Sequence, residues 1–416
     1  MSSLAPALTT PSVYRRPLRE RLADVLRPRG PVWTPFNVIS VPIILLAAVL
    51  LVIRFTYGLG SITNLTQTVP WGLWIGFDVV TGVAFAGGAY VITFMVYILG
   101  LEQYRPIVRA TVLNGLLAYM FYAGALLLDL GRPWNVINPI IGNEFGLSSV
   151  MFLVAWHFML YMFMEFVEFS PAIAEWLGWP RVKKFLYSMT LGAVILGFTL
   201  SALHQAGLGA LYLMTKTKIH PLWYSEFLPL LFLVSSVFAG LALVILEGTI
   251  SRRVFQHRMD DRHRLGHKGI VMSLSRVCAM TMFVYLFLLT LALIHGQEIA
   301  LLSTGMGAWY LLEVIGLVLV PCILFILAAH RGSMPVAKLA AALALSGIVM
   351  NRLNVSIIAF RWDAAVRYVP SWMEIEVTLA VIFVEVWVFR WIVHRLPVLG
   401  PTDGSTSSTR TGVEEA

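Results

Sequence analysis

The chain has 416 residues, of which 58% are hydrophobic and only 12% are charged, and its mean hydropathy is +0.80. Soluble domains carry about 25% charged residues, so this composition excludes an ordinary soluble protein and predicts an all-α polytopic membrane protein. The formal net charge of +8 comes mostly from short basic loops, and it therefore does not indicate nucleic-acid binding.

Apolar runs of spanning length recur along the chain after a polar tail, residues 1–35, which contains Pro and Arg. No short apolar segment with a small-residue cleavage site occurs there, so we expect no removable signal peptide. A spanning helix needs about 20 residues. Ten predicted helices cover residues 36–57, 71–99, 107–130, 148–170, 185–206, 226–250, 270–295, 306–329, 335–357 and 374–395. The last segment, 396–416, is rich in Gly, Ser and Thr and is predicted to be disordered.

Lys and Arg are distributed unevenly over the predicted loops. If the N-terminus is cytoplasmic, the inner segments hold 22 of these residues and the outer segments hold 6, with Arg276 and Arg352 left inside helices. Because cytoplasmic loops carry the excess of positive charge, both termini are predicted to be cytoplasmic. The outer loops are long, aromatic and rich in Gly and Pro, which indicates a docking face for a partner or a ligand.

A charged stretch, LLLDLGRPWN, closes the third apolar run. Asp129 lies in the last turn of that run, before Gly131 and Pro133 break the helix. Burying an acidic side chain in an apolar membrane helix costs several kcal/mol of free energy unless the carboxyl group is paired or hydrated. Such a residue therefore indicates a functional site. Arg132 is the nearest partner in sequence, and a salt bridge that only fixes the helix end is the alternative interpretation.

Other polar residues also gather at the outer side of the predicted helices. Asp78 lies about 10 Å below Trp71, at about 1.5 Å per residue, and His204 ends the run 185–206. Similar positions in later helices are held by Gln205, His295, Glu298, Glu313, Asn351, Arg352, Asn354, Glu374 and Glu376. So many polar groups at one depth predict a wet polar pocket, whereas separate structural pairs are the alternative.

The fourth predicted helix has polar residues at helical spacing. His157, Tyr161, Met164 and Glu168 follow one another at intervals of four, three and four residues and share one face, with Glu165 nearly a quarter-turn away. A histidine and carboxylates in series can relay protons. Hydrogen bonds that only hold helices together are the alternative.

The chain lacks the usual ligand sets for redox metals. Its two cysteines are too few for an iron–sulfur cluster, which needs about four ligands, and no CxxCH haem-attachment motif occurs. Membrane haem needs axial ligands on facing helices, but His157 is predicted at mid-membrane while His204 and His295 lie at the outer edge. We therefore expect no haem, iron–sulfur cluster or metal in this chain.

Seven motifs in order carry a family resemblance: PWGLWIGFD (70–78), FAGGAY (85–90), LDLGRPWN (128–135), EFSPA (168–172), LHQAGLGAL (203–211), KIHPLWYSE (218–226) and ILEGT (245–249). With RLNVSIIAF and YVPSWMEIE further on, the chain resembles the NrfD/polysulfide-reductase membrane-subunit family over roughly residues 36–395. It is most similar to the ten-helix membrane subunit of periplasmic-facing uptake nickel–iron hydrogenases.

The resemblance implies two four-helix bundles, helices 2–5 and 6–9, flanked by helices 1 and 10. Residues 36–206 would hold helix 1 and the first bundle, and residues 226–395 the second bundle and helix 10. It also implies a location in the bacterial cytoplasmic membrane, without haem, and a quinone site near the outer face of the first bundle. A ferredoxin-like iron–sulfur subunit would dock above that site, together with a catalytic subunit such as a nickel–iron hydrogenase.

Carried over by motif position, the quinone-binding residues are Asp78, Asp129, Arg132 and His204, and none of them is a catalytic residue in its own right. The implied function is electron transfer between the partner's iron–sulfur cluster and menaquinone or ubiquinone.

The candidate proton-transfer residues are His157, Tyr161, Glu165 and Glu168. Some relatives have an acid early in the fourth helix where this chain has Leu153, so His157 would have to take its place. Protons could enter from the cytoplasm, which would make quinone reduction electrogenic, or from outside, which would make it neutral.

Two other functions fit a polytopic protein. An ion-coupled transporter often has helices broken near the midplane in paired repeats, but Pro321 has no matching break in the other half of the chain. A di-haem cytochrome b needs facing histidines at matched depth, which this sequence lacks.

The charge distribution makes a testable prediction of topology. Reporter fusions at Arg258 and at the C-terminus should report cytoplasm, and fusions within 212–222 should report periplasm, because the basic loops stay inside. Inverted signals at both kinds of position would contradict the orientation or the number of helices.

Overall fold

The computed structural model describes residues 25, 27–29, 31–69, 71–138, 141, 149–255 and 261–399; for Ala123 and residues 261–265 only the backbone is described. Most of the predicted basic tail, part of the loop after Asp129 and the end of the chain from residue 400 fall outside these ranges.

Nine helices of the described chain are long and apolar enough to cross a membrane: Pro35–Tyr57, Trp74–Tyr97, Glu102–Asp129, Val150–Leu177, Pro180–Leu213, Leu228–Phe255, Gly266–His295, Gly305–Arg331 and Met334–Ile358. The described residues form no β-strand, only two isolated bridges. The predicted tenth helix, α14 (Trp372–Val393), has 22 residues but is more polar because it contains three glutamates and Arg390. The prediction of an all-α polytopic membrane protein is confirmed.

Several spans are composed of consecutive segments. The first is α2 (Pro35–Tyr57), and α7 (Val150–Leu177), α8 (Pro180–Leu213), α9 (Leu228–Phe255) and α10 (Asp261–His295) are continuous. The composite spans are η3–α3–α4 (Trp74–Gly82, Val83–Phe85, Gly87–Tyr97), η4–α5–η5–α6 (Glu102–Ile107, Val108–Ala118, Tyr119–Ala123, Leu126–Asp129), α11–η11–α12 (Gly305–Leu311, Leu312–Leu319, Val320–Arg331) and α13–η12 (Met334–Leu353, Asn354–Ile358). Within them η3, η5, η11 and η12 are π-helical, a form that is rare and frequent at functional sites.

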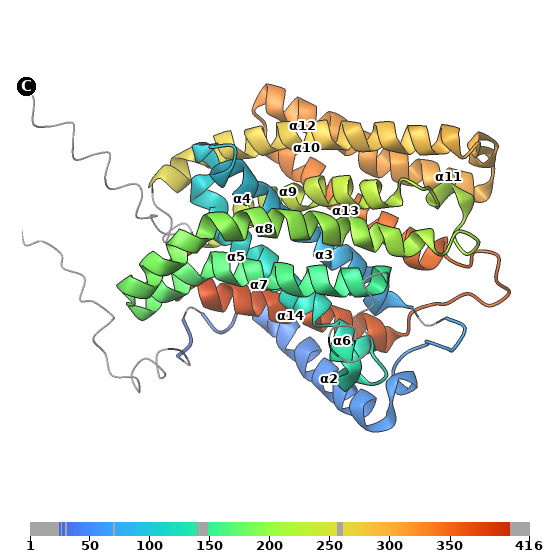
Figure 1. Ribbon diagram of the computed structural model, residues 1–416, viewed down its shortest axis with the longest axis horizontal. Helices are drawn as coiled ribbons and strands as arrows, with labels where there is room; N and C mark the ends of the chain where they lie inside the picture. The colour runs from blue at the N-terminus through green and yellow to red at the C-terminus, as the bar shows by residue number, and fades with distance from the viewer. Residues whose placement is uncertain are drawn as a thin grey trace, which may run out of the picture.

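The spans lie side by side (Figure 1), and we divide eight of them in chain order into two groups. One group contains α4, α5, α7 and α8; the other contains α9, α10, α12 and α13. Helix α2 packs along α14 at the lower edge of Figure 1. We call the end that holds residues 25–29 and 391–399 the tail end, and the opposite end, with residues 58–73, 214–227 and 359–371, the loop end.

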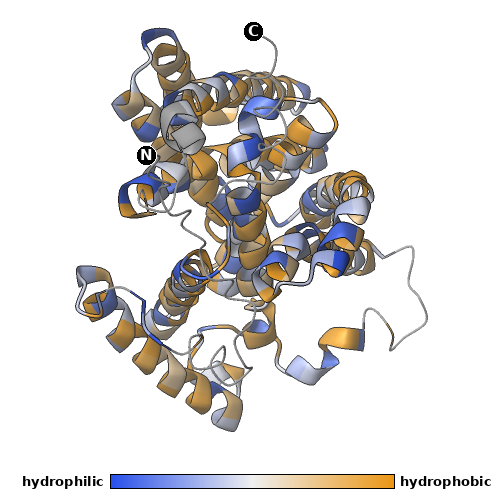
Figure 2. Ribbon diagram, turned by 90° about the vertical axis from the view of Figure 1, so that its left-hand side faces the viewer, coloured by the Kyte–Doolittle hydropathy of each residue, from blue (hydrophilic) through white to orange (hydrophobic). Residues whose placement is uncertain are grey.

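The outward faces of the helices are apolar. Figure 2 shows hydrophobic residues along most of the ribbon of each long helix. Large side chains such as Leu45, Val52 and Phe283 are more than half exposed. In water such faces would favour aggregation, whereas in a bilayer they contact lipid, as expected of a multi-pass membrane protein.

The two groups of helices meet where α4 crosses α9. A Cβ atom added to Gly240 would lie 1.8 Å from the backbone nitrogen of Gly88, and one added to Gly87 would lie 2.1 Å from the carbonyl oxygen of Ser236. Only glycine allows two backbones to come this close. The motif FAGGAY therefore serves to join the two groups.

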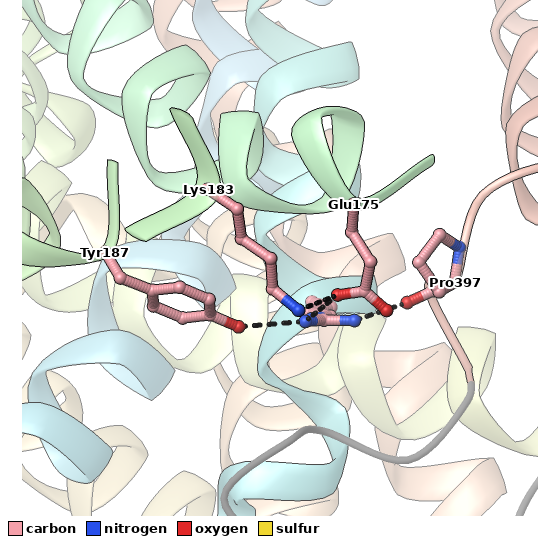
Figure 3. Close-up of polar contacts among 5 residues, drawn as sticks. Glu175, Lys183, Tyr187 and Pro397 are labelled. Atoms are coloured by element: carbon pink, nitrogen blue, oxygen red, sulfur yellow. Dashed lines mark hydrogen bonds and ion pairs between the residues drawn. The ribbon is translucent and has the colours of Figure 1, made fainter. Parts of the chain in front are cut away.

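The tail end is held by a polar network around Arg109, and Figure 3 labels four other residues of this network, Glu175, Lys183, Tyr187 and Pro397. Arg109 donates to Glu175 Oε2 at 3.0 Å, to the Tyr187 hydroxyl at 2.9 Å and to the carbonyl oxygen of Pro397 at 2.8 Å. Lys183 Nζ lies 3.0 Å from the same Glu175 oxygen. The network joins α5, α7 and α8 to the segment that follows α14.

That segment is packed as far as the described chain extends. Leu396, Val398 and Leu399 are buried in the core, so the packed chain includes the first four residues of the range 396–416. Arg395 donates to the carbonyl oxygens of Val25 and Arg27, each at 2.8 Å. The two ends of the described chain are thus held together at the tail end.

Candidate functional site

Asp78 is fully buried near the loop end, within the π-helical segment η3. Its Oδ2 accepts a long hydrogen bond of 3.4 Å from Thr378 of α14. Its Oδ1 is buried and has no hydrogen-bond partner among the described residues. An unsatisfied buried carboxyl oxygen requires an explanation, and an absent ligand or water is one.

Asp129 is the last residue of α6 and is partly buried. Its Oδ1 also lacks a hydrogen-bond partner within the described chain. Arg54, near the loop end of α2, donates to the carbonyl oxygens of Leu128, at 2.9 Å, and Leu130. These are carbonyls that a helix end leaves unpaired, and the charge of Arg54 acts on Asp129 from this position.

A charge that acts on Asp129 is therefore supplied by another helix, through Arg54. Among the described residues no ion pair joins Asp129 to Arg132, whose side chain is exposed. The chain leaves helical geometry at Leu130, with ψ 122°, which carries Arg132 away from the carboxyl group. The alternative interpretation, a salt bridge between Asp129 and Arg132 that fixes the helix end, thus has no ion pair behind it in the described chain.

Glu374 lies beside this region but is fully hydrogen-bonded. Its carboxyl group accepts from the backbone nitrogens of Ser371, at 2.8 Å, and Asn64, at 3.1 Å, and from the Tyr368 hydroxyl. With Ser371 it forms a capping box at the start of α14. Glu374 therefore has a structural role, and its negative charge acts on Asp129 from there.

Asp78 and Asp129, which we call the carboxyl pair, interact electrostatically. The unused oxygens of both are buried, and Leu127, two residues before Asp129 in α6, is 40% exposed. Each member has an unused oxygen, so the pair can accept hydrogen bonds when ionised or donate when protonated. Such groups can bind a small polar headgroup and exchange protons with it.

His204 lies inside α8 rather than at its end. The predicted helix 185–206 extends in the structure from Pro180 to Leu213, which puts His204 about 13 Å below the loop end, at about 1.5 Å per residue. The apolar residues around Gly207 and Gly209 continue the helix beyond residue 206. The side chain is 2% exposed, and its Nδ1 is 3.0 Å from the Tyr119 hydroxyl.

Tyr119 connects His204 with the polar face of α7. Its ring packs edge-on against Tyr161 at 4.6 Å, and the Tyr161 hydroxyl donates to Glu165. Glu165 retains one buried oxygen that has no hydrogen-bond partner in the described chain. His157 acts electrostatically on His204, and Glu168 acts on Glu165. We call these six residues the relay cluster: Tyr119, His157, Tyr161, Glu165, Glu168 and His204.

The predicted site residues thus form two neighbouring groups and one exposed arginine. In the described chain, no hydrogen bond or ion pair joins His204 to Asp78 or Asp129. The segment η5 lies between the groups: Tyr119 contacts His204, and Tyr122 lies beside Asp78 and Glu385. Neither tyrosine was selected from the sequence, because nothing in an apolar helix distinguishes them from packing residues.

The polar residues of the second group of helices form a separate cluster. Glu313 accepts hydrogen bonds from Trp223, Asn351 and Asn354 at 2.6–2.7 Å. Arg352 donates to Asn351 and lies 3.5 Å from the centre of the Phe232 ring. The cavity beside this cluster has a volume of about 30 Å³, which holds water but no headgroup. The outer polar residues therefore do not form one common wet pocket.

Comparison with known proteins gives a family match and several relatives. Residues 61–361 match the family model described as polysulphide reductase, NrfD. A protein of Nitratidesulfovibrio vulgaris is 39% identical over 88% of this chain and 95% of its own length. The probable Ni/Fe-hydrogenase 2 b-type cytochrome subunit of Escherichia coli is 30% identical over 86% of this chain and 91% of its own. The menaquinone reductase integral membrane subunit of N. vulgaris is 26% identical over 82% of this chain and 86% of its own length.

The geometry around α6 makes a testable prediction. Arg54→Ala should lower the thermal stability of the detergent-purified protein. The substitution leaves the helix-end carbonyl oxygens unpaired and removes the positive charge of Arg54 from Asp129. Losing one partner of a buried charged group costs about 3–5 kcal/mol of folding free energy. Arg132→Ala, the matched control, should change stability by less than about 0.5 kcal/mol, since its side chain is exposed. Equal destabilisation by both variants would contradict this assignment.

Proposed function

The chain belongs to the NrfD polysulphide-reductase family, and on this premise we propose that it is the quinone-interacting membrane subunit of a respiratory oxidoreductase complex. The observation that carries the proposal is the carboxyl pair, a fully buried and a partly buried acid that each have one oxygen without a hydrogen-bond partner in the described chain. The printed names of the relatives, a menaquinone reductase subunit and a hydrogenase subunit, support this assignment.

The proposed orientation puts the tail end in the cytoplasm. The inner segments hold 22 Lys and Arg against 6 in the outer segments, which supports this direction. The carboxyl pair would then face the outer side of a bacterial cytoplasmic membrane. A ferredoxin-like iron–sulfur subunit, with its catalytic subunit, would dock on the loop end, within reach of the same site.

The carboxyl pair has the chemistry to bind a quinone headgroup. Quinone carbonyls accept hydrogen bonds, which a protonated Asp78 or Asp129 can donate, and Arg54 keeps a positive charge close to Asp129. Conversion of a quinone to a quinol takes two electrons, supplied by the partner's cluster, and two protons. The protein's own part is to hold the headgroup and to deliver protons, which is the usual division of work with a redox-active molecule.

The relay cluster suits proton delivery from the tail end. Helix α7 runs from the loop end at Val150 to the tail end at Leu177, so His157, Tyr161, Glu165 and Glu168 descend through the membrane in that order. With Leu153 at the position of the acid present in some relatives, His157 is the last of these four groups on a path from the tail end and the nearest to the loop end. Uptake of protons from the cytoplasm would make quinone reduction electrogenic.

The b-type cytochrome named in the E. coli relative does not fit the histidines of this chain. Aromatic rings pack closely around His204, with ring centres 5.5 Å away for Tyr119 and 6.0 Å away for Phe158. A haem axial ligand needs a free ring nitrogen facing an open flat slot. We propose that the chain is haem-free.

An absorption spectrum checks this directly. The purified chain should show no reducible b-type Soret band. A stoichiometric band that disappears in His157→Ala or His204→Ala would overturn the haem-free assignment.

The quinone site is tested by substitution in the assembled complex. Asp129→Asn and Asp78→Asn should each lower electron transfer to quinone by at least about tenfold, because general acid–base groups contribute about 10²–10⁴-fold. His204→Ala should lower it by interrupting the relay cluster. Reduction of a soluble dye by the partner enzyme should continue in all three variants. Glu102→Gln, at an exposed position of the tail end away from the proposed docking face, is the matched control.

The amount of each variant in the membrane has to be measured in parallel. Normal assembly with lost quinone activity supports the site. Loss of the whole complex would assign a structural role to the substituted residue. Unchanged quinone activity in both aspartate variants would refute the site and direct attention to Glu313 and Arg352.

A further inference from the structure

Arg276 is a charged residue on the lipid-facing side of an apolar helix. It lies in α10, ten residues inside the apolar span that begins at Gly266, and its side chain is exposed. Met280 and Phe283, four and seven residues further on, are 70% and 69% exposed on the same face. No hydrogen bond, ion pair or ring contact joins Arg276 to any other residue of the described chain. A cation within a membrane span usually has a partner and a function.

A groove between α10 and α12 begins at this arginine. Its volume is about 560 Å³. Arg276 and His330 form its polar wall, and Met280, Phe283 and Ile326 contribute apolar surface. The groove is therefore polar at one place and apolar over the rest of its length.

The polar part of the groove lies toward the tail end. Helix α12 ends at Arg331, directly after His330. At the turn that follows, a Cβ atom added to Gly332 would lie 3.5 Å from Lys268 Nζ. Lys268 lies about 12 Å along α10 from Arg276, at about 1.5 Å per residue. The long side chain of Arg276 can extend toward the membrane interface, which brings its guanidinium group closer to Lys268. Cationic groups thus gather at headgroup depth, with apolar residues deeper in the bilayer.

We propose that this groove binds an anionic phospholipid of the tail-end leaflet. Its phosphate would contact Arg276, with His330 beside it, and an acyl chain would lie along Met280 and Phe283. Charge complementarity selects the ligand: a lone exposed arginine favours a net negative headgroup over a zwitterionic one, and basic pockets between membrane helices suit such lipids. This lipid site is independent of the proposed quinone function, because it lies in the other group of helices.

The experiment compares lipid retention by the full-length chain. The protein is reconstituted in bilayers that mix phosphatidylglycerol and phosphatidylcholine, re-extracted in mild detergent, and its bound lipid is measured by native mass spectrometry. The native chain should retain phosphatidylglycerol preferentially. Arg276→Gln should reduce that preference about tenfold, the scale of one charge-assisted hydrogen bond, while Arg276→Lys should keep most of it. Lys338→Gln, an exposed basic position of α13 outside the groove, should retain it fully.

A second variant keeps the test informative if Arg276→Gln folds poorly. Ala329→Leu narrows the groove without removing a charge, and it should also reduce retention of phosphatidylglycerol. Equal retention of the two lipids by the native chain would overturn the proposal, as would unchanged preference in a folded Arg276→Gln variant. A photo-cross-link from position 280 to a co-purified protein instead of to lipid would also overturn it, and would assign the groove to a partner helix.

Discussion

A carboxyl group buried within a membrane span has to find its hydrogen-bond donors inside the protein, since the hydrocarbon supplies none. Glu313 and Glu374 meet this requirement, because each accepts three hydrogen bonds from neighbouring residues. Asp78 and Asp129 do not, and each has one oxygen without a donor among the described residues. Glu165 and Glu376 also have one such oxygen, so the difference separates acids that only hold the fold from acids that can serve a ligand or exchange a proton, and it supports the proposed quinone site.

Irregular helices position these polar groups. Asp78 lies in η3, Tyr119 and Tyr122 in η5, Glu313 in η11 and Asn354 in η12, and all four segments are π-helical. A π-helical turn contains an extra residue, which changes the direction of the side chains that follow it. The widened turns therefore occur where polar side chains face the interior, while the continuous helices α9 and α10 contribute mainly packing. Local helix geometry and polar chemistry are coupled in this protein.

Much of the architecture could be predicted from hydropathy, because apolar runs and helix lengths are local properties of the chain. The burial of Asp78 also followed from its position inside such a run. The role of Arg54 could not be predicted, because Arg54 lies 75 residues before Asp129 in the sequence. Periodicity shows which face of a helix is polar, but it does not show which other helix packs against that face. The close approach of Gly88 and Gly240 was missed for the same reason.

Errors in helix ends had larger consequences for the site. With α8 ending at Leu213 instead of residue 206, His204 moves from the membrane edge into the interior and joins Tyr119 and Tyr161. The quinone-binding and proton-transfer residues, separate in the sequence-based prediction, then share one histidine. In the proposed mechanism His204 accordingly connects the proton path to the headgroup rather than binding it at the surface.

The central claim is that the quinone headgroup binds at Asp78 and Asp129, and photo-labelling of the intact complex with an azido-quinone tests it most directly. The account predicts that the label is recovered in peptides that contain η3 or α6, and that excess unlabelled quinone prevents labelling there. Specific labelling confined to peptides around Glu313 or Asn351, with none near Asp129, would contradict it.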